Sequence, residues 1–166
     1  MPVADRGTNV TEHEVRIAAR PEVVFGYFTD PAKLVEWMGV EAVLDPRPGG
    51  VFRLVFQPAP PVLEMLGGLE PGESNVVLGE FVEVVAHARI AFTWGYEKRL
   101  FSLPPQSTAV EVSLEPDGEE TILRLAHRRL PAEATDFHRG GWHHYLARLA
   151  ILAAGSDPGV DPLQAA

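Results

Sequence analysis

The chain of 166 residues contains no cysteine. Disulfide bonds, thiolate catalysis and metal sites built from cysteine are therefore excluded. Basic residues are scarce as well: 14 Lys and Arg stand against 23 Asp and Glu, giving a formal net charge of −9. Nucleic acid and anionic membranes both select basic surfaces, so neither is an expected partner.

Long apolar runs are missing too. No stretch approaches the roughly 18 apolar residues that a membrane span needs, and the N-terminus has no apolar signal segment. We therefore expect a soluble, cytoplasmic protein. The length fits one domain, and 46% apolar residues suffice for a sizeable core. We expect a flexible N-terminus over 1–9, one domain over 10–154, and a flexible, Pro- and Gly-rich tail over 155–166.

Motifs that would name a chemistry are also lacking. The sequence has no HExxH, no GxSxG nucleophile elbow and no Gly-rich phosphate loop after a strand. His138, His143 and His144 share one predicted helix, but their spacing turns His138 about 140° and 240° away from the other two. Such an arrangement lacks the i, i+4 pair of a helical zinc site, so no metal and no cofactor are expected.

The longest predicted element is a helix from Pro131 to Ala154, which Gly155 terminates. Before it, alternating apolar and polar residues predict short strands, the first beginning near Val10. Pro21 and the pair Asp30-Pro31 each open a short helix after that strand. Further strands are expected at about 40–45, 51–57, 76–85, 89–96, 108–116 and 121–129.

The segment from Pro58 to Asn75 is rich in Pro and Gly and has no strand period. Loops of this length are often lids or binding loops. Its apolar residues predict that it folds back onto the body of the protein. These residues are Val62, Leu63, Met65, Leu66 and Leu69.

This order of elements predicts an α+β, helix-grip fold. A curved antiparallel sheet of about seven strands would carry the long C-terminal helix over its concave face, with two short helices after the first strand. The apolar face of such a sheet must be covered. One helix cannot fill the concavity of a strongly curved sheet, so we expect a cavity between helix and sheet.

The cavity is predicted to bind an apolar or aromatic small molecule. His127 is the weakest-defined position: it is a core histidine, a ligand-polarising or acid/base group, or a solvent-facing side chain. Glycines in mid-helix cost roughly 1 kcal/mol each relative to alanine, so Gly140 and Gly141 indicate close approach by the sheet or room for a ligand. The expected ligand-binding residues are Trp37, Phe56, Phe81, Trp94, Tyr96, His127, Phe137, Gly141, Trp142 and Tyr145.

Several short motifs resemble one known family in their order and spacing. They are Pro21-Glu22-Val23-Val24-Phe25, Asp30-Pro31 with Trp37, Pro48-Gly49-Gly50, Gly79-Glu80-Phe81-Val82-Glu83-Val84, Arg89-Ile90-Ala91-Phe92-Thr93-Trp94, Thr121-Ile122-Leu123 with His127, and Gly141-Trp142. Over about residues 10–153 the chain resembles the single-domain bacterial branch of the family related to the C-terminal domain of the Hsp90 ATPase activator. That family lies within the START/Bet v 1-like (SRPBCC, polyketide cyclase-like) superfamily.

The resemblance implies a helix-grip fold with a hydrophobic pocket under the long helix, but no common activity. Relatives include lipid and hormone binders and aromatase/cyclases. Two alternatives to ligand binding therefore stay open. One is a cyclase- or hydratase-like enzyme in which His127 or Tyr96 moves a proton. The other is a stress-response or chaperone-associated interaction protein. The sequence is also compatible with a homodimer.

Overall fold

The computed structural model describes residues 9–165. Apart from Asn9, the N-terminal segment that we expected to be flexible lies outside them. The strands are β1 (Asn9–Ile17), β2 (Glu41–Leu44), β3 (Val51–Phe56), β4 (Asn75–Val85), β5 (Arg89–Trp94), β6 (Thr108–Asp117) and β7 (Glu120–Leu130). The helices are α1 (Pro21–Thr29), α2 (Pro31–Leu34), α3 (Pro60–Leu66) and α4 (Ala132–Ala153), with a 3-10 turn, η1 (Leu100–Ser102), after β5.

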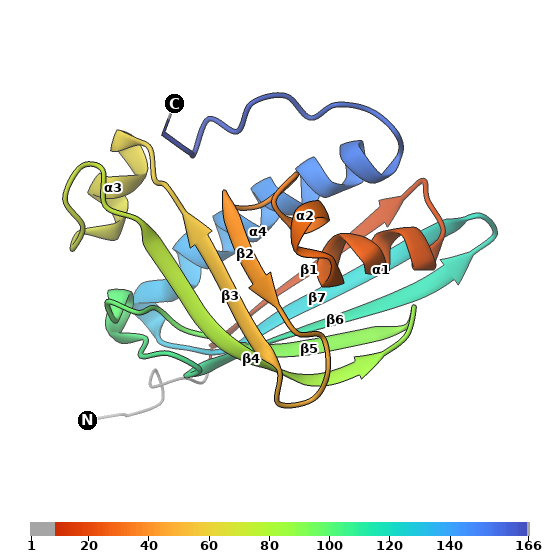
Figure 1. Cartoon of the computed structure of the whole chain (residues 1–166), viewed down its shortest axis with the longest axis horizontal. Helices are drawn as coiled ribbons and strands as arrows, with labels where there is room; N and C mark the ends of the chain where they lie inside the picture. Colours follow the sequence, from red (N-terminus) through yellow and green to blue (C-terminus); the bar gives the residue numbers. More distant parts are fainter. Residues whose placement is uncertain (1–8, 166) are drawn as a thin grey trace.

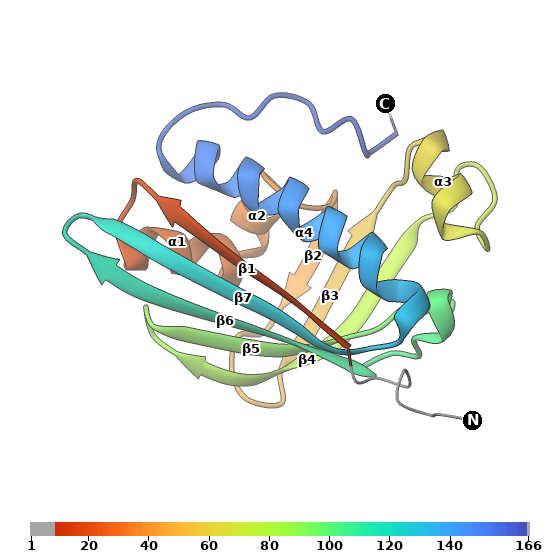
Figure 2. The ribbon, with the colours of Figure 1, turned by 180° about the vertical axis from the view of Figure 1, so that it is seen from behind.

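The seven strands form one antiparallel sheet in the order β1-β7-β6-β5-β4-β3-β2. Each strand from β2 onward pairs with the next one in the chain, and β1 completes the sheet beside β7. Helix α4 crosses one face of this curved sheet and packs chiefly against β1 (Figures 1 and 2). The predicted α+β helix-grip fold is thus confirmed.

Helices α1 and α2 fill one end of the concave face. Their starts follow from local chemistry: Pro21 and Pro31 occupy first-turn positions, and the Asp30 carboxylate accepts a hydrogen bond from the Ala32 amide at 3.0 Å. Phe28 and Trp37 are each 1% exposed, and their rings meet edge-on with centroids 5.1 Å apart. This end of the domain is therefore solid core.

Helix α3 was not predicted, although the sequence analysis placed its apolar residues against the body. It begins at Pro60 and ends at Gly67, which adopts the left-handed conformation at φ 58°. Leu66 is buried. Helix α3 lies near the N-terminal end of α4 and the start of β4 (Figure 1). Among the described residues, no helix is long and apolar enough to cross a membrane.

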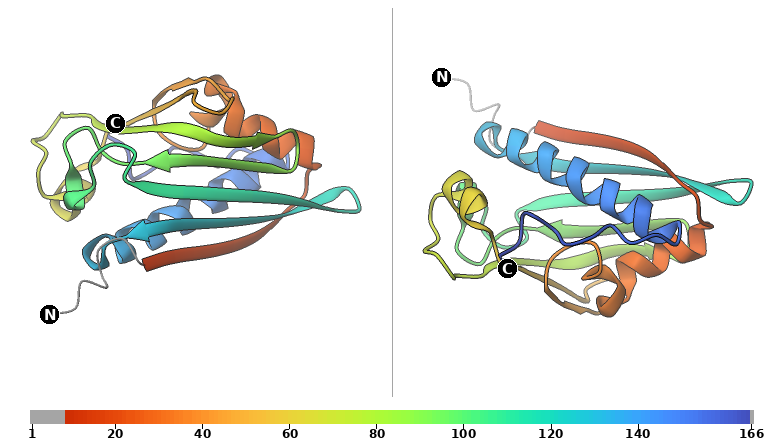
Figure 3. Two further views of the ribbon diagram at one scale, coloured as in Figure 1. Left: turned by 90° about the horizontal axis from the view of Figure 1, so that it is seen from below. Right: turned by 90° about the horizontal axis from the view of Figure 1, so that it is seen from above.

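The C-terminal segment turns at Gly155 and runs back along α4 toward α3 (Figures 1 and 3). Its end pairs with the chain after β3: the Ala165 amide donates to the Gln57 carbonyl at 2.7 Å, and the Ala59 amide donates to the Leu163 carbonyl at 2.9 Å. Composition alone predicted a flexible tail over 155–166. In the structure these contacts join residues 163 and 165 of that segment to the chain after β3, and its flexibility stays a prediction.

Candidate functional site

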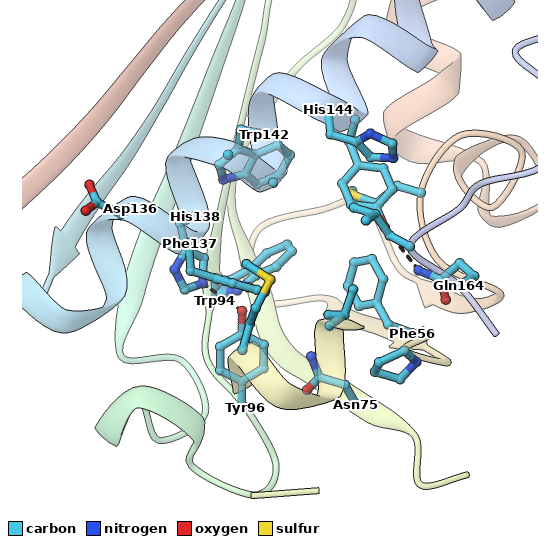
Figure 4. A pocket seen from close by; sticks show the side chains of 18 residues that line it. Phe56, Asn75, Trp94, Tyr96, Asp136, Phe137, His138, Trp142, His144 and Gln164 are labelled. Carbon is cyan, nitrogen blue, oxygen red and sulfur yellow. Dashed lines mark hydrogen bonds between the residues drawn. The ribbon is translucent and has the colours of Figure 1, made fainter. Parts of the chain in front are cut away.

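A cavity of about 350 Å³ lies between the N-terminal half of α4, the ends of β3 to β5, α3 and the returning tail (Figure 4). Most of its lining side chains are aromatic or aliphatic, and a few polar groups lie among them. The lining consists of Met38, Phe56, Pro58, Val62, Met65, Asn75, Trp94, Tyr96, Asp136, Phe137, His138, Gly140, Gly141, Trp142, His144, Tyr145, Leu163 and Gln164.

Seven of the ten residues predicted to bind a ligand line this cavity: Phe56, Trp94, Tyr96, Phe137, Gly141, Trp142 and Tyr145. Trp37, Phe81 and His127 do not. Trp37 belongs to the solid end, where its indole N–H donates to the Tyr27 carbonyl at 3.0 Å. Phe81 packs edge-on against Phe52 in the middle of the sheet, with centroids 5.7 Å apart.

His127 is fully buried behind Trp142 and has a fixed proton position. The Trp142 indole N–H can only donate, and it lies 3.0 Å from Nδ1 of His127, so Nδ1 is the acceptor. In the neutral ring the proton is therefore on Nε2, which donates to Thr108 Oγ1 at 2.8 Å. The Thr108 hydroxyl in turn donates to the Trp94 carbonyl at 2.6 Å. His127 is a core histidine bonded through side chains.

His138 is the histidine that reaches the cavity, together with Tyr96 (Figure 4). Its Nδ1 lies 2.6 Å from the Ala134 carbonyl, which only accepts, so Nδ1 carries the proton. Nε2 is then the acceptor for the Tyr96 hydroxyl at 2.7 Å. Sequence analysis used His138 only to reject a zinc site. Its position on the Ala134–His138–Trp142 stripe, at i, i+4 spacing, is the signal that it faces inward.

Burial keeps all three groups uncharged. It lowers the pKa of His127 well below the usual value, with a further decrease from the neighbouring His138. Burial also lowers the pKa of His138 to about 4, although the bond to the Ala134 carbonyl opposes this shift. The pKa of Tyr96 is raised by burial. At neutral pH the Tyr96–His138 pair at the cavity wall is therefore uncharged, and so is His127 behind it.

The two mid-helix glycines border open space. A Cβ atom built on Gly140 or Gly141 meets nothing within 4 Å, so neither glycine is required by close approach of the sheet. Gly141 is half-buried on the same flank of α4 as Phe137 and Tyr145, and Gly140 is exposed at the cavity rim. Of the two explanations offered by the sequence, room beside the helix is the one that fits.

The model of the family described as activator of Hsp90 ATPase homolog 1-like protein matches residues 18–154. The chain belongs to this family. No curated protein matches the chain by sequence.

Several solved structures have a fold similar to that of this Hsp90 ATPase activator-like chain. An activator-like protein from Rhizobium etli shares 38% identity with a TM-score of 0.65, over 95% of this chain and 89% of the other. Protein CV1439 from Chromobacterium violaceum has a TM-score of 0.72 at 22% identity, over 89% and 99%. An Hsp90 activator from Plasmodium falciparum has a TM-score of 0.61 at 22% identity, over 86% and 94%.

Sequence reasoning missed four polar residues of this family member's cavity besides His138: Asn75, Asp136, His144 and Gln164. Asn75 is 6% exposed and starts β4, where the sequence analysis expected the end of a loop. Gln164 belongs to the tail and donates to the Tyr145 hydroxyl at 3.0 Å. Alternation from Val77 back to Asn75 could have placed Asn75 on the inner face, whereas nothing in the local sequence points to Gln164.

Proposed function

We propose that the protein binds an apolar or aromatic small molecule in the cavity between the sheet and α4. The observation that carries this proposal is the cavity itself, with aromatic side chains from β3, β5 and α4 converging on a space bordered by Gly141. Its volume of about 350 Å³ falls in the range of roughly 300–1,000 Å³ typical of small-molecule sites. The two mid-helix glycines support the proposal, because they lower helix stability while leaving this space open.

The test uses purified protein, a displaceable fluorescent dye and native mass spectrometry. Gly141→Leu, which places four carbon atoms beside the cavity, should reduce dye affinity at least tenfold. Ala147→Leu, on the exposed side of α4 and outside the cavity lining, is the control and should bind nearly as well as the wild type. An empty cavity in native spectra together with no dye binding by the wild type would refute the proposal.

A cyclase- or hydratase-like activity is the second candidate, and the Tyr96–His138 hydrogen bond is what favours it. This pair, rather than His127, is the one that borders the cavity. With the pKa of His138 at about 4, the imidazole would be a weak base at neutral pH. Turnover that survives unchanged in Tyr96→Phe and His138→Gln would exclude this pair from any reaction.

Family membership supports a third candidate, an interaction with a chaperone of the Hsp90 class. This function would depend on the surface and not on the cavity. Purified protein would then raise the ATPase rate of its cognate Hsp90, and Gly141→Leu would stimulate as well as the wild type. No capture of the chaperone and no change in its ATPase rate would remove this candidate.

A further inference from the structure

Asn75 is a buried polar side chain that lacks a protein partner. It is 6% exposed and lines the cavity, and its side chain makes no hydrogen bond within residues 9–165. Its amide atoms are not among the fully buried atoms that lack a partner, so the carboxamide is open to the cavity and to a ligand inside it. The other lining amide, Gln164, has protein partners, since it donates to Tyr145 and accepts from the Gln57 amide at 2.7 Å.

The sheet register fixes where the Asn75 side chain points. Asn75 pairs directly with Phe56 of β3, so both side chains leave the sheet on the concave side. Two residues along β4, Val77 pairs with Tyr96. Asn75 and Tyr96 are therefore diagonal neighbours on the cavity floor, at a separation of about 7–8 Å for such positions. Figure 4 shows the Asn75 amide directed into the space between Phe56 and Tyr96.

Two further polar residues of the lining, Asp136 and His144, have partners outside the interior of the cavity. Asp136 pairs with Arg139 at 2.6 Å, and His144 pairs with Asp161 at 2.8 Å. The interior itself is lined by neutral groups, so an ionised ligand would lose its hydration without a counter-charge to replace it. An uncharged ligand does not incur this cost.

We infer that Asn75 determines ligand specificity: it selects an uncharged aromatic molecule that carries a hydrogen-bond donor and an acceptor side by side, such as an amide or lactam. The carboxamide of Asn75 offers one C=O and one NH₂, so it can pair with such an edge through two hydrogen bonds. The ring system would lie against the aromatic wall formed by Phe56, Trp94 and Trp142. This inference rests on the proposed ligand-binding function.

Three probes with the same ring system test the inference: 2-naphthamide, 2-methylnaphthalene and 2-naphthoate. Equilibrium dialysis gives the dissociation constant of each for the full chain. We expect the wild type to bind 2-naphthamide about tenfold more tightly than 2-methylnaphthalene, and 2-naphthoate most weakly, as one to two hydrogen bonds in a dry site would give. Asn75→Leu, of similar size, should bind the two neutral probes equally well.

Gln106→Met is the control, because it removes an exposed amide that lies outside the cavity lining. It should keep the tenfold preference for 2-naphthamide. A readout that needs no variant is the side-chain NH₂ signal of Asn75 in a ¹H–¹⁵N spectrum of the wild type. This signal should shift with 2-naphthamide and stay in place with 2-methylnaphthalene.

The results distinguish a failure of the role proposed for Asn75 from a failure of the proposed ligand binding. Equal wild-type affinities for the two neutral probes, or an unchanged preference in Asn75→Leu, would overturn the role of Asn75 while ligand binding stands. Tightest binding of 2-naphthoate would overturn the requirement for an uncharged ligand. Binding of none of the three probes, together with no dye binding, would overturn the proposed function and this inference with it.

Discussion

Gly141→Ala should make the protein more stable. Alanine is favoured over glycine in a helix interior by about 0.8–1.0 kcal/mol, because the glycine backbone loses more conformational freedom on folding. This gain is retained only where the added methyl group fits. A Cβ atom on Gly141 meets no atom within 4 Å, and the residue has no positive φ, so no steric term subtracts from the gain. We expect the free energy of unfolding to rise by about 1 kcal/mol.

The assay is urea and thermal denaturation followed by circular dichroism. For a domain of this size, about 1 kcal/mol corresponds to a melting temperature roughly 2–4 °C higher. Gly140→Ala should give a similar increase, and the double variant about 2 kcal/mol, because neighbouring side chains on a helix do not face each other and neither methyl group meets another atom within 4 Å. A decrease in stability for Gly141→Ala would refute the reasoning, since it would mean that the space beside α4 is already occupied by packed atoms.

The remaining predictions concern the histidines and the tail. The pKa of His138 is about 4 in the folded protein and 6.5 ordinarily, so between these pH values the unfolded chain binds more protons than the folded one. From pH 7 to pH 4, the free energy of unfolding should therefore fall by roughly 3 kcal/mol more in the wild type than in His138→Gln. Urea titrations at each pH measure this difference. Trp142→Phe should cost about 2 kcal/mol, because it leaves Nδ1 of buried His127 without a donor, and a cost under about 0.5 kcal/mol would contradict the assigned tautomer. Pro58 and Gln164 form a non-hydrogen-bonded antiparallel pair, in which Cα atoms are typically about 4.5 Å apart. The double variant Pro58→Cys/Gln164→Cys should therefore form a disulfide on oxidation, seen as a mass loss of about 2 Da. Free thiols after oxidation would refute the position of the tail.

The strands could be predicted from local sequence patterns, because the alternation of apolar and polar residues is visible within each segment. Trp94 and Phe56 were found for the same reason, because each lies on the inner face near the end of its strand, and Tyr96 continues the alternation just past β5. Phe81 shares that inner face and Trp37 follows α2 in the core, but neither lines the cavity. Which part of a concave face stays open depends on where α1 and α2 pack, and that is a tertiary property.

Other features were missed because their signals were weak or long-range. Helix α3 carries a first-turn proline and apolar residues at helical spacing, but its neighbouring Pro and Gly residues hid the pattern. The choice between His127 and His138 depended on Trp142, which covers one ring and leaves the other at the cavity. The tail is held by a few hydrogen bonds to residues far away in the sequence: Gln57 and Ala59 lie more than a hundred positions before it, and Tyr145 about twenty. No local composition encodes such contacts.

The hydrogen-bond chain from Trp142 through His127 and Thr108 to the Trp94 carbonyl has every proton assigned, so it runs in one direction only. It ties one flank of α4 to β7, β6 and β5, and the Tyr96–His138 bond adds a second tie on the same flank. Rolling or sliding the helix would break both ties at once. The adjacent flank, with Gly141, faces the cavity, which α3 and the returning tail also border. We therefore expect α4 to keep its position on the sheet. Ligands should enter and leave between α3 and the C-terminal tail, when these two segments move apart.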